Sequence, residues 1–212
     1  MIERFSDRAE AGRLLAERLL EYGGRDDVVI LALPRGGVPV GRELARALAA
    51  PLDVFLVRKL GLPGQEELAM GAIASSGARV INEQLVAQLG LSADVIDRVA
   101  ERERIELERR EQLYRGERPP PDVRGRVVIL VDDGLATGST MRAAVTALRA
   151  QEPARIIAAI PAGPPESCAT LSREVDEAVC LIQPQPFYAV GLWYRDFAEI
   201  TDDEVRRLLA ET

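Results

Sequence analysis

The chain has 212 residues, of which 47% are hydrophobic and 29% charged, a composition typical of one globular domain or of a domain with a small appendage. The net charge of −7 provides no basic surface for a nucleic-acid backbone, so we expect no nucleic-acid partner. No apolar run is long enough to cross a bilayer and the first residues lack a signal-peptide pattern, so we expect a cytoplasmic protein without a membrane partner.

Two residue types are scarce. Histidine is absent, which excludes Ser-His-Asp triads, Cys-His pairs and histidine metal sites. Lys59 is the only lysine among 27 basic residues, the others being arginine. If arginine replaces lysine wherever a charge alone suffices, the survival of Lys59 indicates a need for a compact ammonium group. Chance survival is the alternative explanation.

The apolar pattern predicts strands and helices in alternation. In chain order, the expected elements are a helix over 6–22 with Ser6 as its N-cap, a strand over 28–33, a helix over 38–50, a strand over 53–57, a loop over 58–71, short strands over 71–74 and 79–82, a helix over 92–115 capped by Ser92, a strand over 127–131, a helix over 139–151, a strand over 155–160, a helix over 165–174, a strand over 178–182 and a final helix opened by Thr201. Short, wholly apolar strands that alternate with helices predict an α/β fold, a doubly wound parallel sheet flanked by helices.

We expect one core over residues 1–182, with a flexible loop at about 58–80 and a charged helix at about 92–115, followed by a small C-terminal segment over 183–212. The charged helix carries pairs such as Arg104–Glu108 at i,i+4 spacing, which is typical of a solvated surface. An arm that joins two copies into a homodimer is the alternative interpretation.

The most informative motif follows the predicted strand over 127–131. Two adjacent carboxylates, Asp132 and Asp133, stand where this strand ends, at the sheet edge where ligands bind in open α/β folds. A short loop then leads into a helix, and its amides and hydroxyls can wrap a phosphate: Ala136, Thr137, Gly138, Ser139 and Thr140. The alternative is a coincidental turn with an N-capping threonine.

This stretch closely resembles the phosphoribosyl diphosphate (PRPP) signature of type I phosphoribosyltransferases, in which four apolar residues and two acids precede a Thr-Gly-x-Thr loop. The resemblance implies that Asp132 and Asp133 hold the ribose 2′- and 3′-hydroxyls and that residues 136–140 hold the 5′-phosphate. It also implies a Mg²⁺ cofactor, bound largely by PRPP oxygens and water with the two aspartates as mainly outer-sphere partners. The implied fold adds a small C-terminal hood to the α/β core.

A second segment, Pro34-Arg35-Gly36-Gly37, resembles the diphosphate-binding loop of the same family and follows its first core strand. The glycines allow close backbone approach, and Arg35 offers a guanidinium to the diphosphate. The family commonly has a cis peptide in this loop, so we predict one between Pro34 and Arg35. The alternative is a glycine turn with a solvated arginine.

Arg58 and Lys59 stand where the family carries its flexible loop. The resemblance implies that this loop closes over bound PRPP, and that Lys59 meets the departing diphosphate in a catalytic role together with Arg58. For Arg58, an ordinary surface charge is an equal alternative.

Blocks over residues 33–37, 57–61, 67–72 and 189–197 resemble a narrower group, the uncharacterised bacterial phosphoribosyltransferase-like proteins. The aromatic cluster over 187–197 is the expected counterpart of the hood that holds a nucleobase, with Phe187 and Trp193 as candidate base-binding residues. A hydrophobic plug over an exposed sheet edge is the alternative interpretation.

The resemblance implies transfer of a phosphoribosyl group from PRPP to a small-molecule acceptor, with a nucleobase favoured. One residue departs from the pattern, because hypoxanthine-guanine enzymes carry an aspartate where this chain has Ala136. The expected general base is then missing, although Glu66 or Glu67 could replace it. A PRPP-sensing regulator that has lost transfer is the runner-up function, and a domain for another phosphorylated metabolite is the third.

Overall fold

Five strands form one parallel sheet, as the sequence predicts. In a computed structural model that describes residues 4–62, 65–74 and 77–211, they are β1 (Val28–Ala32), β2 (Leu52–Val54), β6 (Val127–Val131), β7 (Arg155–Ala162) and β8 (Glu177–Ile182). Their order is β2-β1-β6-β7-β8, and every neighbouring pair is parallel. All residues of the central pair, β1 and β6, are buried. Neither face of this pair carries a polar side chain, so helices must cover both.

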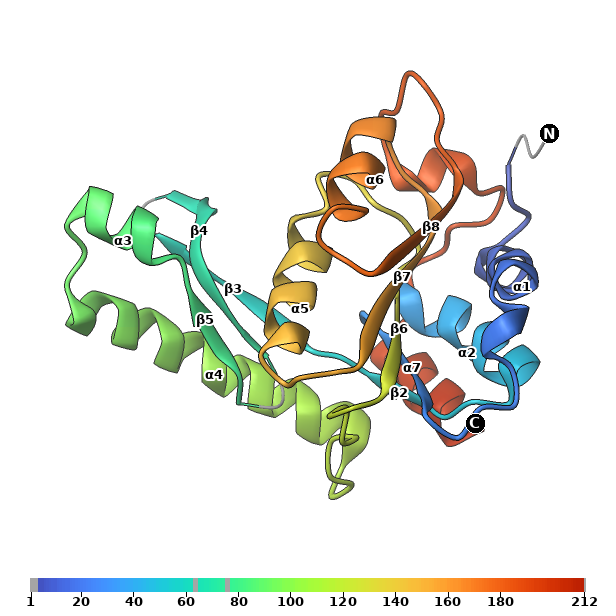
Figure 1. Ribbon diagram of the computed structural model, residues 1–212, viewed down its shortest axis with the longest axis horizontal. Coiled ribbons are helices and arrows are strands. Elements are labelled where there is room, and N and C mark those ends of the chain that lie inside the picture. Colours follow the sequence, from blue (N-terminus) through green and yellow to red (C-terminus); the bar gives the residue numbers. More distant parts are fainter. Residues whose placement is uncertain (1–3, 63–64, 75–76, 212) are drawn as a thin grey trace.

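The helices divide between the two faces of the sheet (Figure 1). On one face, α1 (Arg8–Arg18) and α2 (Gly37–Leu48) pack against alternate residues of the central strands, among them Ile30 and Ile129. On the other face, α5 (Ser139–Arg149) and α6 (Pro165–Leu171) pack against the intervening residues. This is the doubly wound architecture expected from the alternation of strands and helices.

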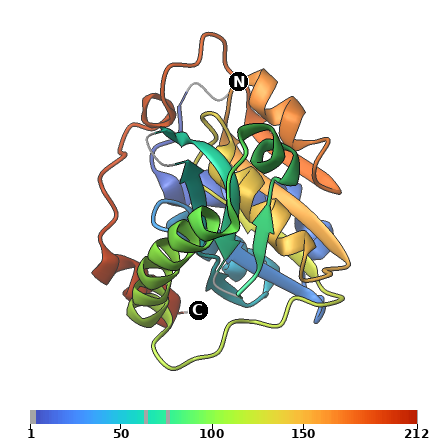
Figure 2. The same cartoon turned by 90° about the vertical axis from the view of Figure 1, so that its left-hand side faces the viewer.

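The described residues within 57–115, which we call the arm, project to one side of this core (Figures 1 and 2). The arm consists of an antiparallel sheet and two helices: β3 (Val57–Leu62), β4 (Gln65–Ala74), β5 (Arg79–Ile81), α3 (Glu83–Leu89) and α4 (Ala93–Arg115). Apolar residues of β3 and β4, such as Leu60 and Met70, pack with those of α4 in a core, the arm core, that continues into the main domain at Ala32 and Val38. The arm therefore has the organisation of a small β-α layer beside the main sheet.

The loop predicted over 58–71 is wrong, because most of it forms β3 and β4. Gly61 and Gly71 serve this sheet, and the mobility expected of the segment stays a prediction. The pairing of β3 with β4 shifts register on both sides of Gly61, and a β-carbon on Gly71 would overlap with the carbonyl oxygen of Val80 on β5. Residues 63–64 and 75–76 of the expected flexible segment lie outside the described residues.

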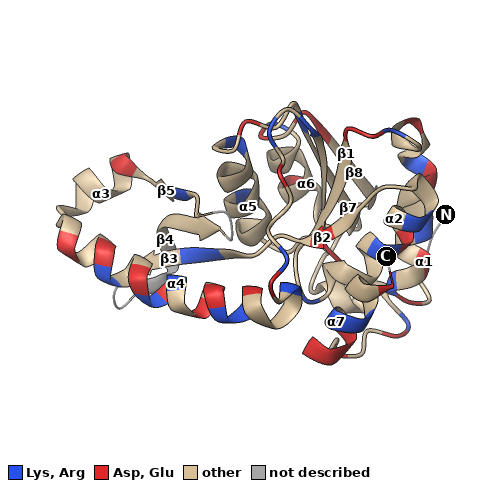
Figure 3. Ribbon diagram, turned by 90° about the horizontal axis from the view of Figure 1, so that it is seen from below, with Lys and Arg blue, Asp and Glu red and all other residues tan. Residues whose placement is uncertain are grey.

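Several element ends also differ from the prediction. The N-cap of α1 is Asp7 rather than Ser6, because the Asp7 side chain accepts a hydrogen bond from the backbone N–H of Glu10 at 2.7 Å. Helix α3, which begins after its cap Asn82, was not predicted. The charged helix over 93–115 begins after Ser92 as predicted. Figure 3 shows its alternating charges, and ion pairs such as Arg104–Glu108 form at the expected i,i+4 spacing.

The chain end beyond β8 divides into two parts. Residues 183–201, which we call the hood segment, include a short 3₁₀ helix, η2 (Val190–Trp193), and bridge back to Phe5 near the start of the chain. Helix α7 (Asp202–Ala210) instead packs with α4 and the arm core. Thr201 caps α7 as predicted, by accepting a hydrogen bond from the Glu204 N–H. In the described ranges, no helix combines the length and the apolar character needed to cross a membrane.

Candidate functional site

The strand order reverses between β1 and β6. The chain leaves β1 toward α2 on one face of the sheet and leaves β6 toward α5 on the other face. Open α/β sheets bind ligands at such a switch point, beyond the carboxyl ends of the strands. Both predicted motifs, the loop over 34–37 and the acids at 132–133, lie at this point.

The two loops are in direct contact. A β-carbon on Gly36 would overlap with the carboxylate of Asp133, and one on Gly37 would lie 2.7 Å from the carbonyl oxygen of Val131. The peptide bond between Pro34 and Arg35 is cis, which confirms the prediction. A side chain at 37 would therefore collide with the backbone at the end of β6, and one at 36 would displace the carboxylate of Asp133.

Asp132 and Asp133 are both partly buried at this contact. Burial raises the pKa of Asp132 well above its ordinary value, and the neighbouring charge of Asp133 raises it further. Burial also raises the pKa of Asp133, while an ion pair with Arg8 opposes that rise. The Arg8 Nε donates to Asp133 Oδ2 at 2.8 Å, and the Tyr194 hydroxyl donates to the Asp133 carbonyl oxygen at 2.5 Å. Ionising these two acids therefore costs free energy, and Asp133 is fixed in place by Arg8 and Tyr194.

Sequence reasoning missed Arg8 and Tyr194. Each reaches Asp133 from a distant part of the chain, and no local motif links these residues to the acids. Arg8 opens α1, and Tyr194 belongs to the hood segment.

The loop over 136–140 leads directly into the N-terminus of α5, as predicted. Gly138 has φ +75°, a conformation that favours glycine, and Ala136, Thr137 and Thr140 are exposed. The Ser167 hydroxyl of α6 donates to the carbonyl oxygen of Ala136 at 2.7 Å and so braces the loop. The first amides of a helix have no intrahelical partners, so this end of α5 can donate to an anion.

Lys59 and Arg58 point to different neighbours, because successive residues of β3 face opposite sides. Lys59 Nζ lies 3.4 Å from Ser139 Oγ in the phosphate loop, and both residues line a cleft of about 680 Å³ between the arm and α5. Arg58 pairs instead with the buried Glu103 of α4 at 2.6 Å. The structure thus brings Lys59 to the site, whereas the contacts of Arg58 favour a structural role, and its catalytic role stays a prediction.

Arg35 lies at the rim of the site. Its guanidinium contacts Glu199 of the hood segment and lies 3.9 Å from Asp202 at the start of α7. A ligand anion would compete with these two carboxylates for Arg35.

Phe187 and Trp193 stack on each other, with ring centroids 6.3 Å apart. Both pack in a cluster with Phe5 and with residues of β8, the edge strand of the sheet. These contacts favour the plug interpretation, and base binding by Phe187 and Trp193 stays a prediction. Another hood residue, Val190, packs directly against the loop that carries the two acids. Its side chain leaves no room for a β-carbon on Gly134, the residue after Asp133.

Replacement by Glu66 or Glu67 of the general base missing at Ala136 stays a prediction. The side chains of Glu66 and Glu67 lie outside the described residues.

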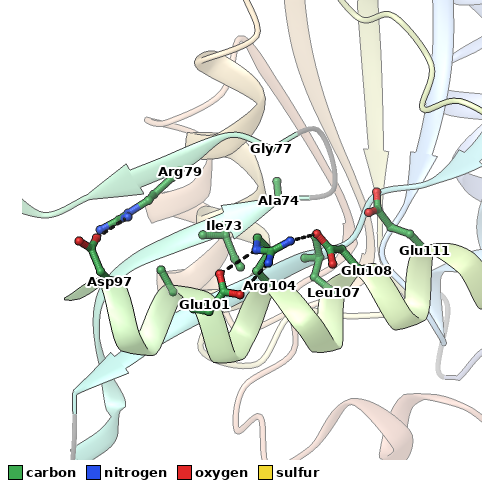
Figure 4. A pocket seen from close by; sticks show the side chains of 11 residues that line it. Ile73, Ala74, Gly77, Arg79, Asp97, Glu101, Arg104, Leu107, Glu108 and Glu111 are labelled. Carbon is green, nitrogen blue, oxygen red and sulfur yellow. Dashed lines mark hydrogen bonds and ion pairs between the residues drawn. The ribbon is translucent and has the colours of Figure 1, made fainter. Parts of the chain in front are cut away.

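A separate cavity of about 430 Å³ lies on the arm beside α4, where Arg104 pairs with Glu101 and Glu108 (Figure 4). This cavity contains none of the predicted site residues.

The carboxylates of Asp132 and Asp133 fit a Mg²⁺ ion that is bound together with a phosphate-containing ligand. Mg²⁺ keeps several waters and is usually held by one or two carboxylates together with substrate phosphates. Two adjacent carboxylates at the switch point match that donor set. The part of the chain that the structure describes contains no group of three or more His, Cys, Asp and Glu side chains that could hold a metal by itself.

Comparison with known proteins agrees with this geometry. The family model for the phosphoribosyl transferase domain matches residues 2–182. Two proteins of Mycobacterium tuberculosis (strains CDC 1551 / Oshkosh and ATCC 25618 / H37Rv), each named "Putative phosphoribosyl transferase", are 47% identical over 95% of this chain. The match spans 45% of the length of each relative, so this chain corresponds to about half of them.

Solved structures share the fold of this chain. The protein TT1426 from Thermus thermophilus has a TM-score of 0.90 and 43% identity over 98% of both chains. A purine phosphoribosyltransferase from Pyrococcus horikoshii is a more distant match, with a TM-score of 0.49 and 19% identity over 92% of both chains. On the family model and the relatives above 40% identity, the chain belongs to the phosphoribosyl transferase domain family.

Proposed function

We propose that this chain binds Mg²⁺–PRPP and transfers its phosphoribosyl group to a nitrogen atom of a nucleobase, with release of diphosphate. The observation that carries the proposal is the contact between two loops at the switch point, where the backbone at Gly36 and Gly37 meets Asp133 and the end of β6. One loop suits a diphosphate and the other a ribose 5-phosphate, and PRPP joins these groups in one molecule.

Each part of PRPP has a candidate partner. The carboxylates of Asp132 and Asp133 accept hydrogen bonds from the ribose 2′- and 3′-hydroxyls. The N-terminus of α5 and the hydroxyls of Thr137, Ser139 and Thr140 donate to the 5′-phosphate. The backbone amides of Arg35 and Gly36 donate to the diphosphate, because Pro34 has no N–H and the Gly37 N–H donates to the Leu33 carbonyl oxygen.

In the reaction, the acceptor nitrogen forms a bond to C1 of the ribose while the bond from C1 to the diphosphate oxygen breaks. The electron pair leaves with the diphosphate, and the proton of the acceptor nitrogen passes to solvent. Lys59 and Arg35 stabilise the charge that develops on the leaving group. Mg²⁺, when bound, neutralises the diphosphate further. Holding both reactants in line supplies much of the remaining acceleration, so no histidine is required.

Two observations support the regulator alternative. Two of the candidate ligand-binding side chains, Asp133 and Arg35, already hold internal ion pairs, and Ala136 supplies no general base. A protein that senses PRPP without turning it over would show the same contacts. Measurement of turnover separates the two functions.

The first prediction concerns turnover. With Mg²⁺–PRPP and a panel of purine and pyrimidine bases, at least one base should stimulate diphosphate release by the wild-type protein. The double variant Asp132→Asn/Asp133→Asn should release diphosphate at least about 100-fold more slowly, because it loses both charged acceptors for the ribose. If the protein binds PRPP but no base stimulates diphosphate release, the result favours the regulator. Unchanged diphosphate release in the double variant would contradict the assignment of Asp132 and Asp133 to the ribose hydroxyls.

The second prediction concerns Lys59. The variant Lys59→Arg keeps the charge but replaces a compact ammonium with a broad planar group. It should lower kcat for diphosphate release by about tenfold and change the KM for PRPP by less than about threefold, because Lys59 acts on the leaving group. Arg58→Lys is the matched control on the neighbouring residue, and its kcat should stay within about threefold of the wild type. Equal kcat values for Lys59→Arg and the wild type would contradict the role of Lys59 and favour the alternative that this lysine survives by chance.

The third prediction concerns stability. A carboxyl group whose pKa is raised on folding stabilises the folded state below its unfolded pKa, and this contribution is lost as pH rises through the folded pKa. Asp132→Asn cannot ionise, so the variant avoids the fall in stability that the wild type undergoes as pH rises. It keeps the Oδ1 that accepts a hydrogen bond from the Asp133 N–H. It should therefore raise the Tm at pH 7.5 by roughly 2–4 °C, with a smaller gain at pH 4.5.

Asp133→Asn serves as the control for this measurement, because it leaves the buried Arg8 without a charged partner. Its Tm at pH 7.5 should be at or below that of the wild type. A gain for Asp132→Asn that does not depend on pH, or no gain, would contradict the energetic cost assigned to this acid.

A further inference from the structure

A buried arginine at the start of the chain contacts the candidate ribose site. Arg8 is 8% exposed, and its guanidinium has three neighbours, one in the loop after β6 and two in the hood segment. Nε donates to Asp133 Oδ2 at 2.8 Å, Nη1 donates to the carbonyl oxygen of Ala198 at 2.8 Å, and the guanidinium carbon lies 3.8 Å from the centre of the Phe197 ring. An arginine buried in this way is fixed in one orientation, because a change would leave a buried charge without its partners.

This contact divides the two oxygens of Asp133 between two tasks. Oδ2 holds Arg8 and lies against the backbone of Gly36. Within the described residues, Oδ1 accepts no hydrogen bond. The backbone of Asp133 is held as well, by the hydroxyl of Tyr194. The residue is thus fixed at its side chain and its main chain, while one carboxylate oxygen stays available to a ligand.

The charge of Arg8 is also needed beside this pair of acids. Across the described ranges 4–62, 65–74 and 77–211, Arg8 is the only arginine or lysine that forms an ion pair with Asp132 or Asp133. Two adjacent, partly buried carboxylates repel each other when both are ionised. Without Arg8, the Asp133 side chain would lose the contact that holds Oδ2 in place and would turn away from Asp132, so an acceptor for a ribose hydroxyl would be lost.

We propose that Arg8 is a positioning residue for ribose binding, which holds Asp133 with one oxygen toward the sugar and joins that acid to the hood segment. The inference rests on the proposed function, because it assigns to Arg8 the orientation of an acid that binds PRPP. Arg8 itself touches neither the sugar nor the diphosphate, so its effect should be confined to ligands that contain ribose.

The test compares two probes in calorimetric titrations with Mg²⁺: PRPP, which contains ribose, and inorganic diphosphate, which does not. The variant Arg8→Met keeps much of the length and removes the charge. It should weaken PRPP binding by at least about tenfold, the effect of losing a charge-assisted hydrogen bond, and change diphosphate binding by less than about twofold. Arg8→Lys restores a charge with a single donor group, so its affinity for PRPP should lie between those of the wild type and Arg8→Met.

Arg13→Met is the matched control, because Arg13 lies on the same helix with its side chain 58% exposed and 3.8 Å from Glu43. It should bind both probes within about twofold of the wild type. In the double variant Arg8→Met/Asp133→Asn, PRPP binding should be no weaker than in Asp133→Asn alone, because Arg8 acts through that acid.

Three results would overturn the inference. Wild-type affinity of Arg8→Met for PRPP would show that Asp133 needs no positioning. Equal weakening of both probes in the folded Arg8 variants would assign Arg8 a purely structural role. If the wild-type protein binds diphosphate but shows no additional affinity for PRPP, the proposed function fails and the role of Arg8 fails with it.

Discussion

The site depends on the packing of one glycine loop against the end of one buried strand. Strands β1 and β6 pair in parallel, from Val28 against Val127 to Ala32 against Val131, so the loops that follow them emerge side by side. Both strands are buried on both faces, which sends the following helices to opposite sides of the sheet. The two loops then line one crevice, and Gly36 admits the carboxylate of Asp133 because it has no side chain.

This packing has an energetic cost that the rest of the chain offsets. Two adjacent carboxylates are held partly out of water, where burial and mutual repulsion raise the pKa of Asp132. Arg8 supplies a compensating positive charge. Tyr194 of the hood segment fixes the backbone of Asp133 through a hydrogen bond to its carbonyl oxygen. Groups whose ionisation is costly are typical of functional sites, because preorganised acceptors bind a ligand without further rearrangement. The start of the chain and the hood segment therefore support a site whose ligand-binding groups lie elsewhere in the sequence.

Local patterns were sufficient for the core and for both loops of the site. The apolar runs over 28–33 and 127–131 predicted buried parallel strands, and the residues that follow each run carried the family resemblance. The pairing of β3 with β4 in the arm could not be predicted in this way, because Gly61 and Gly71 mark close contacts between strands that only the folded sheet reveals. The partners of Arg8 and Arg58 were equally hidden, since Asp133 and Glu103 lie 125 and 45 residues away in the sequence. Charge pairs at such separations leave no periodic signal.

The most direct test of the account is a calorimetric titration of Mg²⁺–PRPP into the wild-type protein, with ribose 5-phosphate titrated under the same conditions. The two ligands share the 5′-phosphate and both ribose hydroxyls and differ in the diphosphate, so the comparison reports on the joined loops. The account predicts one PRPP bound per chain with an affinity at least about tenfold higher than that for ribose 5-phosphate, or about 1.4 kcal/mol. Equal affinities, or no binding of PRPP to protein shown to be folded, would contradict it.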